Sequence, residues 1–206
     1  MRLATLASAS FTALILAFGA QAQPGAATAD PARLEGGEFA MDPAHARVLF
    51  SFQHMGFSTS SGYFTAVDAK LHFDPKAVDA SRLEVSVKLD GIDTTVAMLD
   101  EHLKGADFFD VAHYPVATFK STKIVVTGPA TGAITGDLTL HGVTKPVVLE
   151  ASFNGGGTNP MSKAYVLGFN AVGHLKRSDY GLGGAVPMVG DEVTLTISAE
   201  FDRAKS

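Results

Sequence analysis

Seven histidines are the side chains in this sequence that most readily suggest metal binding or acid–base chemistry. They occupy separate segments of the chain, and they are His45, His54, His72, His102, His113, His141 and His174. None of them forms a His-x-His or His-Glu-x-x-His pattern, the spacings that bring two imidazoles to one metal ion. The sequence therefore predicts no metal site.

Two short polar segments contain residue types that catalytic sites use. Residues 100–102 (Asp-Glu-His) offer acids and a base, but consecutive residues of a helix point in different directions. Ser178 lies between Arg177 and Asp179, without the glycine-flanked turn that exposes a nucleophilic serine. Because no activated nucleophile accompanies either segment, the sequence predicts that the protein is not an enzyme.

His54 and Arg177 are the polar residues that we expect near a ligand. His54 continues the alternation of Phe50 and Phe52, which places it on their inward face. A neutral imidazole there can hydrogen-bond either a ligand head group or a buried backbone group. Arg177 also has two interpretations, a loop-stabilising interaction with an Asp or a contact to a polar or phosphorylated head group.

The composition excludes several classes of function. Cysteine is absent, which excludes disulfides, thiolate catalysis and iron–sulfur clusters. The 16 Lys and Arg residues against 21 Asp and Glu residues give a net charge of -5, so the chain lacks the basic field of nucleic-acid-binding proteins. Apolar residues make up 46% of the 206 residues, and the 21 glycines and 14 phenylalanines favour strands and turns.

The N-terminal residues predict export and one folded domain. Residues 1–22 have the pattern of a cleavable signal peptide, with Arg2, an apolar stretch and a small-x-small site at residues 20–22. The most hydrophobic part, residues 11–18, is short for a bilayer span, so no stable membrane span is expected. Residues 23–37 are rich in Ala, Pro and Gly and predict a flexible leader, and residues 38–206 form the domain.

Alternating apolar and polar residues predict about eight strands. The clearest run has its apolar residues at positions 193, 195, 197, 199 and 201. The same period occurs within 48–52, 69–73, 85–89, 117–119, 138–140, 147–153 and 167–171. Strands with one apolar face fit a closed barrel or a two-sheet sandwich, and the strand number favours the barrel. Breaks in phase near Thr65 and Ser121 predict β-bulges.

One helix and several connections are also predicted. The helix covers residues 95–104, with Met98, Leu99 and Leu103 on an apolar face that caps one end of the barrel. Residues 127–132 and 141–146 carry turn sequences typical of antiparallel connections. We interpret residues 154–160 (NGGGTNP) as a loop between two strands.

Several segments together carry a family resemblance. They are 41–45 (MDPAH) followed by Phe50 and His54, 92–94 (IDT), 100–103 (DEHL), 108–111 (FFDV), 114–121 (YPVATFKS), 136–147 (GDLTLHGVTKPV) and 177–182 (RSDYGL). In this order they resemble the YceI-like family of periplasmic polyisoprenoid-binding proteins over about residues 41–201. Ala46 stands where Ser is common in the family, and Leu99 replaces an Arg usually found before Asp100.

The resemblance implies an all-β fold, an extended lipocalin-like eight-stranded antiparallel β-barrel with one short helix capping an end. It also implies a homodimer and an interior that holds a long-chain isoprenoid or fatty amphiphile, with no other cofactor. We predict that the ligand-binding residues are the inward side chains of the strands, two residues near one end, and the two polar groups above. They are Phe50, Phe52, His54, Leu71, Phe73, Val85, Val87, Leu89, Met98, Leu103, Phe119, Leu138, Leu140, Leu167, Phe169, Arg177, Leu195 and Ile197.

The sequence thus predicts a periplasmic carrier of a quinone-type or polyprenyl-type lipid. Burial of the apolar tail drives binding in this interpretation, and no chemical step is needed. Two alternatives stay open: a periplasmic interaction or stress-response module whose barrel is filled by its own side chains, and an enzyme acting on such a lipid. A cavity distinguishes the carrier from the module, and a nucleophile paired with a base would distinguish the enzyme.

Overall fold

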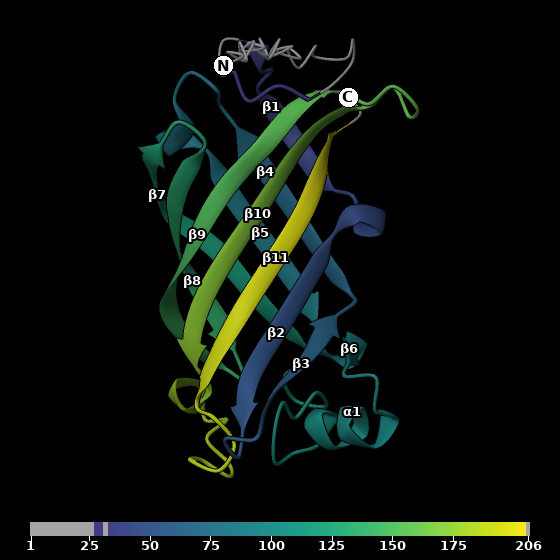
Figure 1. Ribbon diagram of the computed structural model, residues 1–206, viewed down its shortest axis with the longest axis vertical. Helices are drawn as coiled ribbons and strands as arrows, with labels where there is room; N and C mark the ends of the chain where they lie inside the picture. The colour runs from purple at the N-terminus through teal and green to yellow at the C-terminus, as the bar shows by residue number, and fades with distance from the viewer. Residues whose placement is uncertain (1–26, 31–32, 205–206) are drawn as a thin grey trace, which may run out of the picture.

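The computed structural model describes residues 27–30 and 33–204, so the predicted signal peptide at residues 1–22 lies outside the described residues. Strands dominate the chain, and one α-helix and short 3₁₀ helices (η) connect them (Figure 1). The elements are β1 (Gly37–Met41), η2 (Pro43–His45), β2 (Arg47–His54), β3 (Ser58–Phe64), β4 (Val67–Phe73), η3 (Val78–Ala80), β5 (Arg82–Lys88), η4 (Leu89–Gly91), β6 (Ile92–Asp93), α1 (Ala97–Lys104), β7 (Val116–Gly128), β8 (Thr131–Leu140), β9 (Val143–Thr158), β10 (Tyr165–Lys176), η5 (Arg177–Tyr180) and β11 (Glu192–Arg203).

The strands form one antiparallel sheet that closes on itself. The closed order is β1-β4-β5-β7-β8-β9-β10-β11, and β11 returns to β1 with Phe201 opposite Met41. This closure confirms the predicted eight-stranded barrel and decides against the sandwich, because a sandwich would leave sheet edges unpaired. Figure 1 shows β1 at one end of the barrel and α1 at the other, and we call these the β1 end and the α1 end.

Two walls of the barrel contain interrupted strands. β1 and β2 both pair with β11, but η2 separates them. β3 and β4 are separated at Thr65, whose N–H donates to the Gly91 carbonyl at 2.9 Å. The bulge predicted near Thr65 is therefore wrong, because β3 pairs with β2 and β6 whereas β4 pairs with β1 and β5. The bulge predicted near Ser121 is confirmed by a register shift between Ser121 and Lys123.

Glycine has two different roles in the connections. Gly142 follows His141 in the two-residue turn from β8 to β9, where φ values of 50° and 73° suit a tight hairpin. The loop predicted at 154–160 is wrong, because β9 continues through the glycine run to Thr158. A Cβ on Gly156 would lie 2.6 Å from Leu167 Cδ2, so glycine permits close packing here instead of forming a turn.

The predicted helix is present as α1, which packs beside β6. Leu99 and Leu103 are half-buried, but Met98 is 83% exposed. The placement of Met98 on the apolar face is therefore wrong, because Leu99 and Leu103 are four residues apart and share one face, whereas the adjacent residue Met98 points away from it. Among the described residues, no helix combines the length and apolar character needed to cross a membrane.

The buried side chains differ between the two ends of the barrel. Toward the β1 end the core is aromatic and contains Phe39, Phe73 and Phe201, with Phe153 and Phe169 packed against it. Toward the α1 end the buried cluster is Leu89, Ala117, Leu140, Tyr180 and Leu182. A third cluster, Phe119, Val147 and Leu149, shares packing neighbours with both. The apolar interior is therefore continuous along the barrel.

Candidate functional site

Two adjoining cavities lie in the interior of the barrel. The first has a volume of about 180 Å³ and the second a volume of about 110 Å³. Leu71, Ile134, Ala151 and Phe169 line both cavities, so the two spaces neighbour each other. No charged side chain of the described residues lines either cavity. Such a space suits an apolar chain and offers no counter-charge to an ion.

A row of small residues across three strands leaves this space open. Along β9, Leu149, Ala151 and Phe153 alternate with outward residues. Ala151 lies opposite Gly132 of β8 and Ala171 of β10. Because protein interiors otherwise pack at crystal density, three neighbouring small residues in a wall of Leu and Phe leave a void. The cavity thus follows from side-chain volumes at one level of the barrel.

A segment preceding β1 contributes to the wall of the first cavity. Thr28 and Gly156 exchange two backbone hydrogen bonds, both of 2.9 Å. Ala29 and Leu34 line the cavity itself. The Glu35 N–H donates to the Tyr165 hydroxyl at 2.9 Å. Part of the segment predicted as a leader therefore contacts the barrel at the β1 end.

Some of the predicted ligand-binding residues line the cavities. Leu71 and Phe169 line both, Phe73 lines the first, and Val85 and Ile197 line the second. These side chains come from four different strands, and the barrel closure brings them together. Their role in ligand binding stays a prediction, and the geometry places them where such a ligand would lie.

The other predicted residues lie outside the two cavities. They are Phe50, Phe52, His54, Val87, Leu89, Met98, Leu103, Phe119, Leu138, Leu140, Leu167, Arg177 and Leu195. Leu167 is fully buried at 0% exposure, and Phe119 belongs to the central cluster. Phe50 stacks on Phe52 with ring centroids 6.4 Å apart. Most of this group fills the barrel instead of lining an open space, because alternation identifies the inward face but not the depth of each layer.

His54 ends β2 at the α1 end of the barrel. Its backbone pairs with Val189 in an isolated bridge, and its side chain is half-buried. The residue after it, Met55, donates its N–H to the Met188 carbonyl at 2.7 Å. His54 therefore joins the β2–β3 turn to the loop between η5 and β11, away from both cavities.

Arg177 is buried, and its side chain holds the loop between η5 and β11. Its guanidinium donates to the carbonyls of Gly190 (2.8 Å), Gly184 (2.8 Å), Val189 (2.8 Å) and Leu182. Burial lowers the pKa of Arg177, and the nearby Asp191 carboxylate acts in the opposite direction.

These contacts agree with a loop-stabilising role for Arg177, but its partners are backbone carbonyls and not an Asp carboxylate. The side chain is only 8% exposed, so its donors are occupied by loop carbonyls and are not directed at a head group. No ion pair between Arg177 and an Asp forms among the described residues. Asp179 instead lies 3.8 Å from Lys145, and Asp191 binds Ser178.

Tyr180 carries a polar atom that the sequence analysis did not single out. Its side chain is 1% exposed in the cluster at the α1 end, and its hydroxyl has no hydrogen-bond partner among the described residues. Burial, followed by the charge of Asp179, raises the pKa of Tyr180. An unpaired buried hydroxyl is uncommon in proteins, so Tyr180 is a candidate hydrogen-bond partner for a polar group that enters the interior.

The two segments considered for catalysis have structural hydrogen bonds. Asp100 Oδ1 accepts from the Thr94 hydroxyl at 2.6 Å and from the Thr94 N–H at 2.7 Å, which lowers the pKa of Asp100. The Ser178 hydroxyl donates to Asp191 Oδ2 at 2.8 Å. These contacts hold the start of α1 and the loop after η5, and they leave neither group directed at a cavity.

Ile134, Ala151 and Ala171 are lining residues that the sequence prediction missed. Ala151 and Ala171 were recognised as inward residues, but the predicted site favoured bulky side chains. The useful signal was the coincidence of small residues on neighbouring strands, which only the strand register reveals.

A closed, eight-stranded antiparallel barrel with an apolar interior is the class of protein that the fold and the site define. The family model of the YceI-like domain matches residues 39–201. The chain belongs to the YceI-like domain family, which confirms the resemblance found in the sequence.

Curated relatives cover most of the chain. A UPF0312 protein of Pseudomonas savastanoi pv. phaseolicola is 41% identical over 158 residues, covering 77% of this chain and 80% of the relative. Protein YceI of Escherichia coli O157:H7 is 42% identical over 156 residues, covering 76% of this chain and 81% of the relative.

Solved structures share the barrel. BcnA of Burkholderia cenocepacia superposes with a TM-score of 0.71 at 25% identity, covering 78% of this chain and 98% of BcnA. The Campylobacter jejuni YceI protein gives a TM-score of 0.68 at 30% identity, covering 74% of this chain and 90% of that protein. A polyisoprenoid-binding domain from Saccharophagus degradans gives 0.61 at 12% identity, covering 82% of this chain and all (100%) of that domain, and shares the fold.

Proposed function

We propose that this protein is a periplasmic carrier that holds a long-chain isoprenoid, of quinone or polyprenyl type, inside its barrel. Residues 1–22 direct export and are then cleaved, and the mature barrel binds the lipid without altering it. The observation that carries the proposal is the pair of adjoining apolar cavities, about 180 Å³ and 110 Å³, neither of which is lined by a charged side chain of the described residues.

The physical driving force is burial of the lipid tail. Each CH₂ group moved from water into an apolar interior contributes about 0.8 kcal/mol, so a long tail gains stability with every unit enclosed. The two cavities together cannot enclose a long chain without rearrangement of the half-buried side chains around them. Val87, Leu138 and Leu195 are such half-buried inward residues between the cavities and the α1 end.

The name of one structural neighbour suggests the ligand class that we propose. The Saccharophagus degradans domain described as polyisoprenoid-binding has the same barrel, although its 12% identity carries the fold alone. Family membership of this chain adds that the barrel belongs with other YceI-like domains. The isoprenoid nature of the ligand is our extension of these two facts to the cavities of this protein.

Native mass spectrometry of the mature protein tests the proposal. The protein is purified from a periplasmic extract without detergent, and the mass of any departing ligand is identified after organic extraction. We expect an isoprenoid at about one molecule per chain. A ligand-free protein that also fails to take up quinones and polyprenols would overturn the carrier function and favour an interaction module with a filled barrel.

A further inference from the structure

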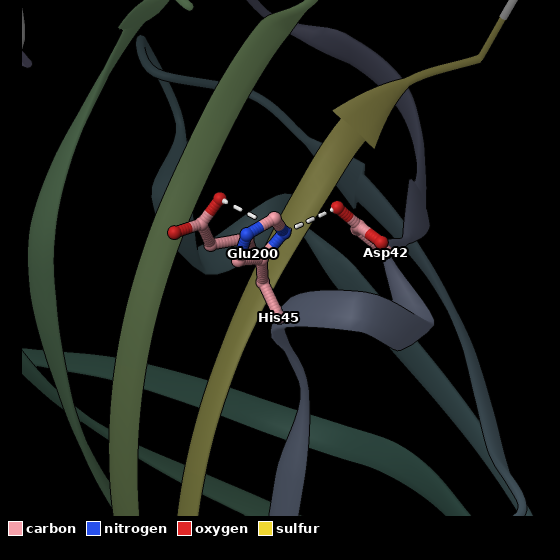
Figure 2. Close-up of side chains that lie close together, drawn as sticks. All are labelled: Asp42, His45 and Glu200. Atoms are coloured by element: carbon pink, nitrogen blue, oxygen red, sulfur yellow. Dashed lines mark hydrogen bonds and ion pairs between the residues drawn. The ribbon is translucent and has the colours of Figure 1, made fainter.

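Three metal-ligating side chains converge on the outside of the barrel where β1 is interrupted. Asp42 caps the start of η2, His45 is its last residue, and Glu200 projects from β11 beside them (Figure 2). His45 Nδ1 lies 2.6 Å from Asp42 Oδ2 and 4.0 Å from Glu200 Oε2. One ligand atom from each of the three residues lies within 4.8 Å of the others.

The local sequence fixes the positions of two of these groups. Asp42 Oδ1 accepts from the Ala44 N–H at 2.8 Å and caps η2, which leaves Oδ2 for His45. Pro43 starts the 3₁₀ turn, and one turn later His45 returns to the side of Asp42. The Asp42 N–H also donates to the Glu200 carbonyl at 2.9 Å, which holds the turn against β11.

Negative charge is in excess at this cluster. Asp202 lies two residues beyond Glu200 on β11 and interacts electrostatically with both Asp42 and His45. The two nearby arginines are engaged elsewhere. Arg47 donates to the carbonyls of Ala44 and Ala46, and Arg203 binds Glu35 and the Gly36 carbonyl.

Carboxylates outnumber cationic groups at this cluster even when the imidazole is protonated. Asp42, Glu200 and Asp202 place three carboxylates around the single imidazole of His45, which favours a bound cation.

Other histidine–acid pairs on the barrel lack this convergence. His72 lies 2.6 Å from Glu38, and His174 lies 3.7 Å from Glu192. Within the described residues, the Asp42, His45 and Glu200 group is the one in which three such ligand atoms meet. His174 is therefore a matched control, because it is an exposed imidazole beside a carboxylate without a third ligand.

We propose that Asp42, His45 and Glu200 bind one first-row divalent transition-metal ion, and that Asp202 adds negative charge beside the site. An imidazole nitrogen with carboxylate oxygens suits Zn²⁺ or Mn²⁺ better than Ca²⁺ or Mg²⁺, which prefer oxygen ligands alone. Metal–ligand bonds of about 2.0–2.2 Å place ligand atoms roughly 3.3 Å apart. The observed separations of 2.6 and 4.0 Å bracket that value, so small side-chain rotations complete the site.

The site lies directly outside the second cavity. Met41 precedes Asp42, Ala46 follows His45, and Ala199 and Phe201 flank Glu200, and all four of these neighbours line that cavity. A metal ion would therefore fasten the interrupted β1–β2 wall to β11 at the level of the cavity. By linkage, any effect of the metal on cavity occupancy is matched by an equal effect of the occupant on metal affinity.

Calorimetric titration of chelator-treated, tag-free protein with ZnCl₂, in the absence of lipid, tests the site. We expect one Zn²⁺ per chain in the wild type and at least a tenfold weaker affinity in His45→Gln and in Glu200→Gln. His174→Gln should bind as the wild type does. Asp42 is left unchanged because it also caps η2.

A second measurement separates binding from folding. Thermal unfolding of the metal-free variants should match the wild type, and Zn²⁺ should raise the midpoint of the wild type and of His174→Gln but not of His45→Gln. Two results would overturn the metal site: the absence of saturable Zn²⁺ binding, or equal losses of Zn²⁺ affinity in His45→Gln and His174→Gln. Either would show that the His45 imidazole only forms an ion pair. Because no lipid enters either measurement, the carrier function is tested independently.

Discussion

The two ends of the barrel have the same strand topology, but their interiors are packed differently. At the β1 end, small residues at Gly132, Ala151 and Ala171 face one another inside a ring of phenylalanines, and space remains. At the α1 end, Leu89 and Leu182 pack tightly and Arg177 binds the loop beneath them. The contrast shows that a strand ladder sets the shape of a barrel, whereas side-chain volume decides whether it is hollow.

The largest effect on stability is expected from replacing Arg177, which holds the loop at the α1 end. Replacing Arg177 with Met removes every donor to four loop carbonyls, and unpaired buried acceptors are costly. We expect a loss of about 3 kcal/mol in the free energy of unfolding, measured with urea. Arg177→Lys should lose nearly as much, because one ammonium cannot reach all four carbonyls. Wild-type stability in Arg177→Met would show that the loop does not depend on this side chain.

Filling the cavities at the β1 end should weaken ligand binding without unfolding the protein. In Ala151→Phe a ring would occupy the space shared by the two cavities. We expect at least a tenfold loss of isoprenoid affinity, which is about 1.4 kcal/mol, in a binding titration. Val148→Phe is the control, since Val148 lies on the outer face of the same strand at 47% exposure. Equal affinity in both variants would place the ligand elsewhere.

A smaller effect on stability is expected from replacing Tyr180, in the buried cluster at the α1 end. Because its buried hydroxyl has no partner among the described residues, Tyr180→Phe should raise the free energy of unfolding of the ligand-free protein by about 1 kcal/mol. If the hydroxyl meets a ligand head group, the same variant should bind a quinone more weakly but a pure hydrocarbon chain equally well. Lower stability of Tyr180→Phe would indicate that the hydroxyl has a partner in solution.

The smallest expected effect concerns acid stability at the α1 end. Hydrogen bonds from the Ser178 N–H and hydroxyl lower the pKa of Asp191 in the folded protein. A carboxyl group whose pKa is lower in the folded protein than in the unfolded chain stabilises the fold at pH values above its unfolded pKa, about 3.9. This contribution is lost as the pH falls through the folded pKa. Asp191→Asn should therefore be slightly less stable at pH 7 and show a flatter decline below pH 4 in thermal unfolding. An unchanged acid profile would contradict this assignment.

The alternation of apolar residues predicts strands with one buried face, and the number of these strands favours a barrel over a sandwich. Runs such as the one in β11 have a period of two because one face of the strand is buried. This period is visible in the sequence whichever strands pair and in whichever register. The pattern shows a break in phase near Thr65, but it cannot distinguish a bulge from a strand that ends and changes partners, because both interrupt the alternation. The glycine run at 155–157 predicts a loop because the sequence does not show which neighbour requires close approach.

The candidate site divides along the same line. The sequence by itself determined which face of each strand points inward and that Leu71 and Phe169 belong to it, because these depend on residue type and local period. Only the tertiary structure decided where space remains, that Arg177 serves its own loop, and that Glu200 meets Asp42 and His45 across more than 150 residues of sequence. The physical reason is that volume, burial and charge clustering are sums over strands that only the barrel register brings together.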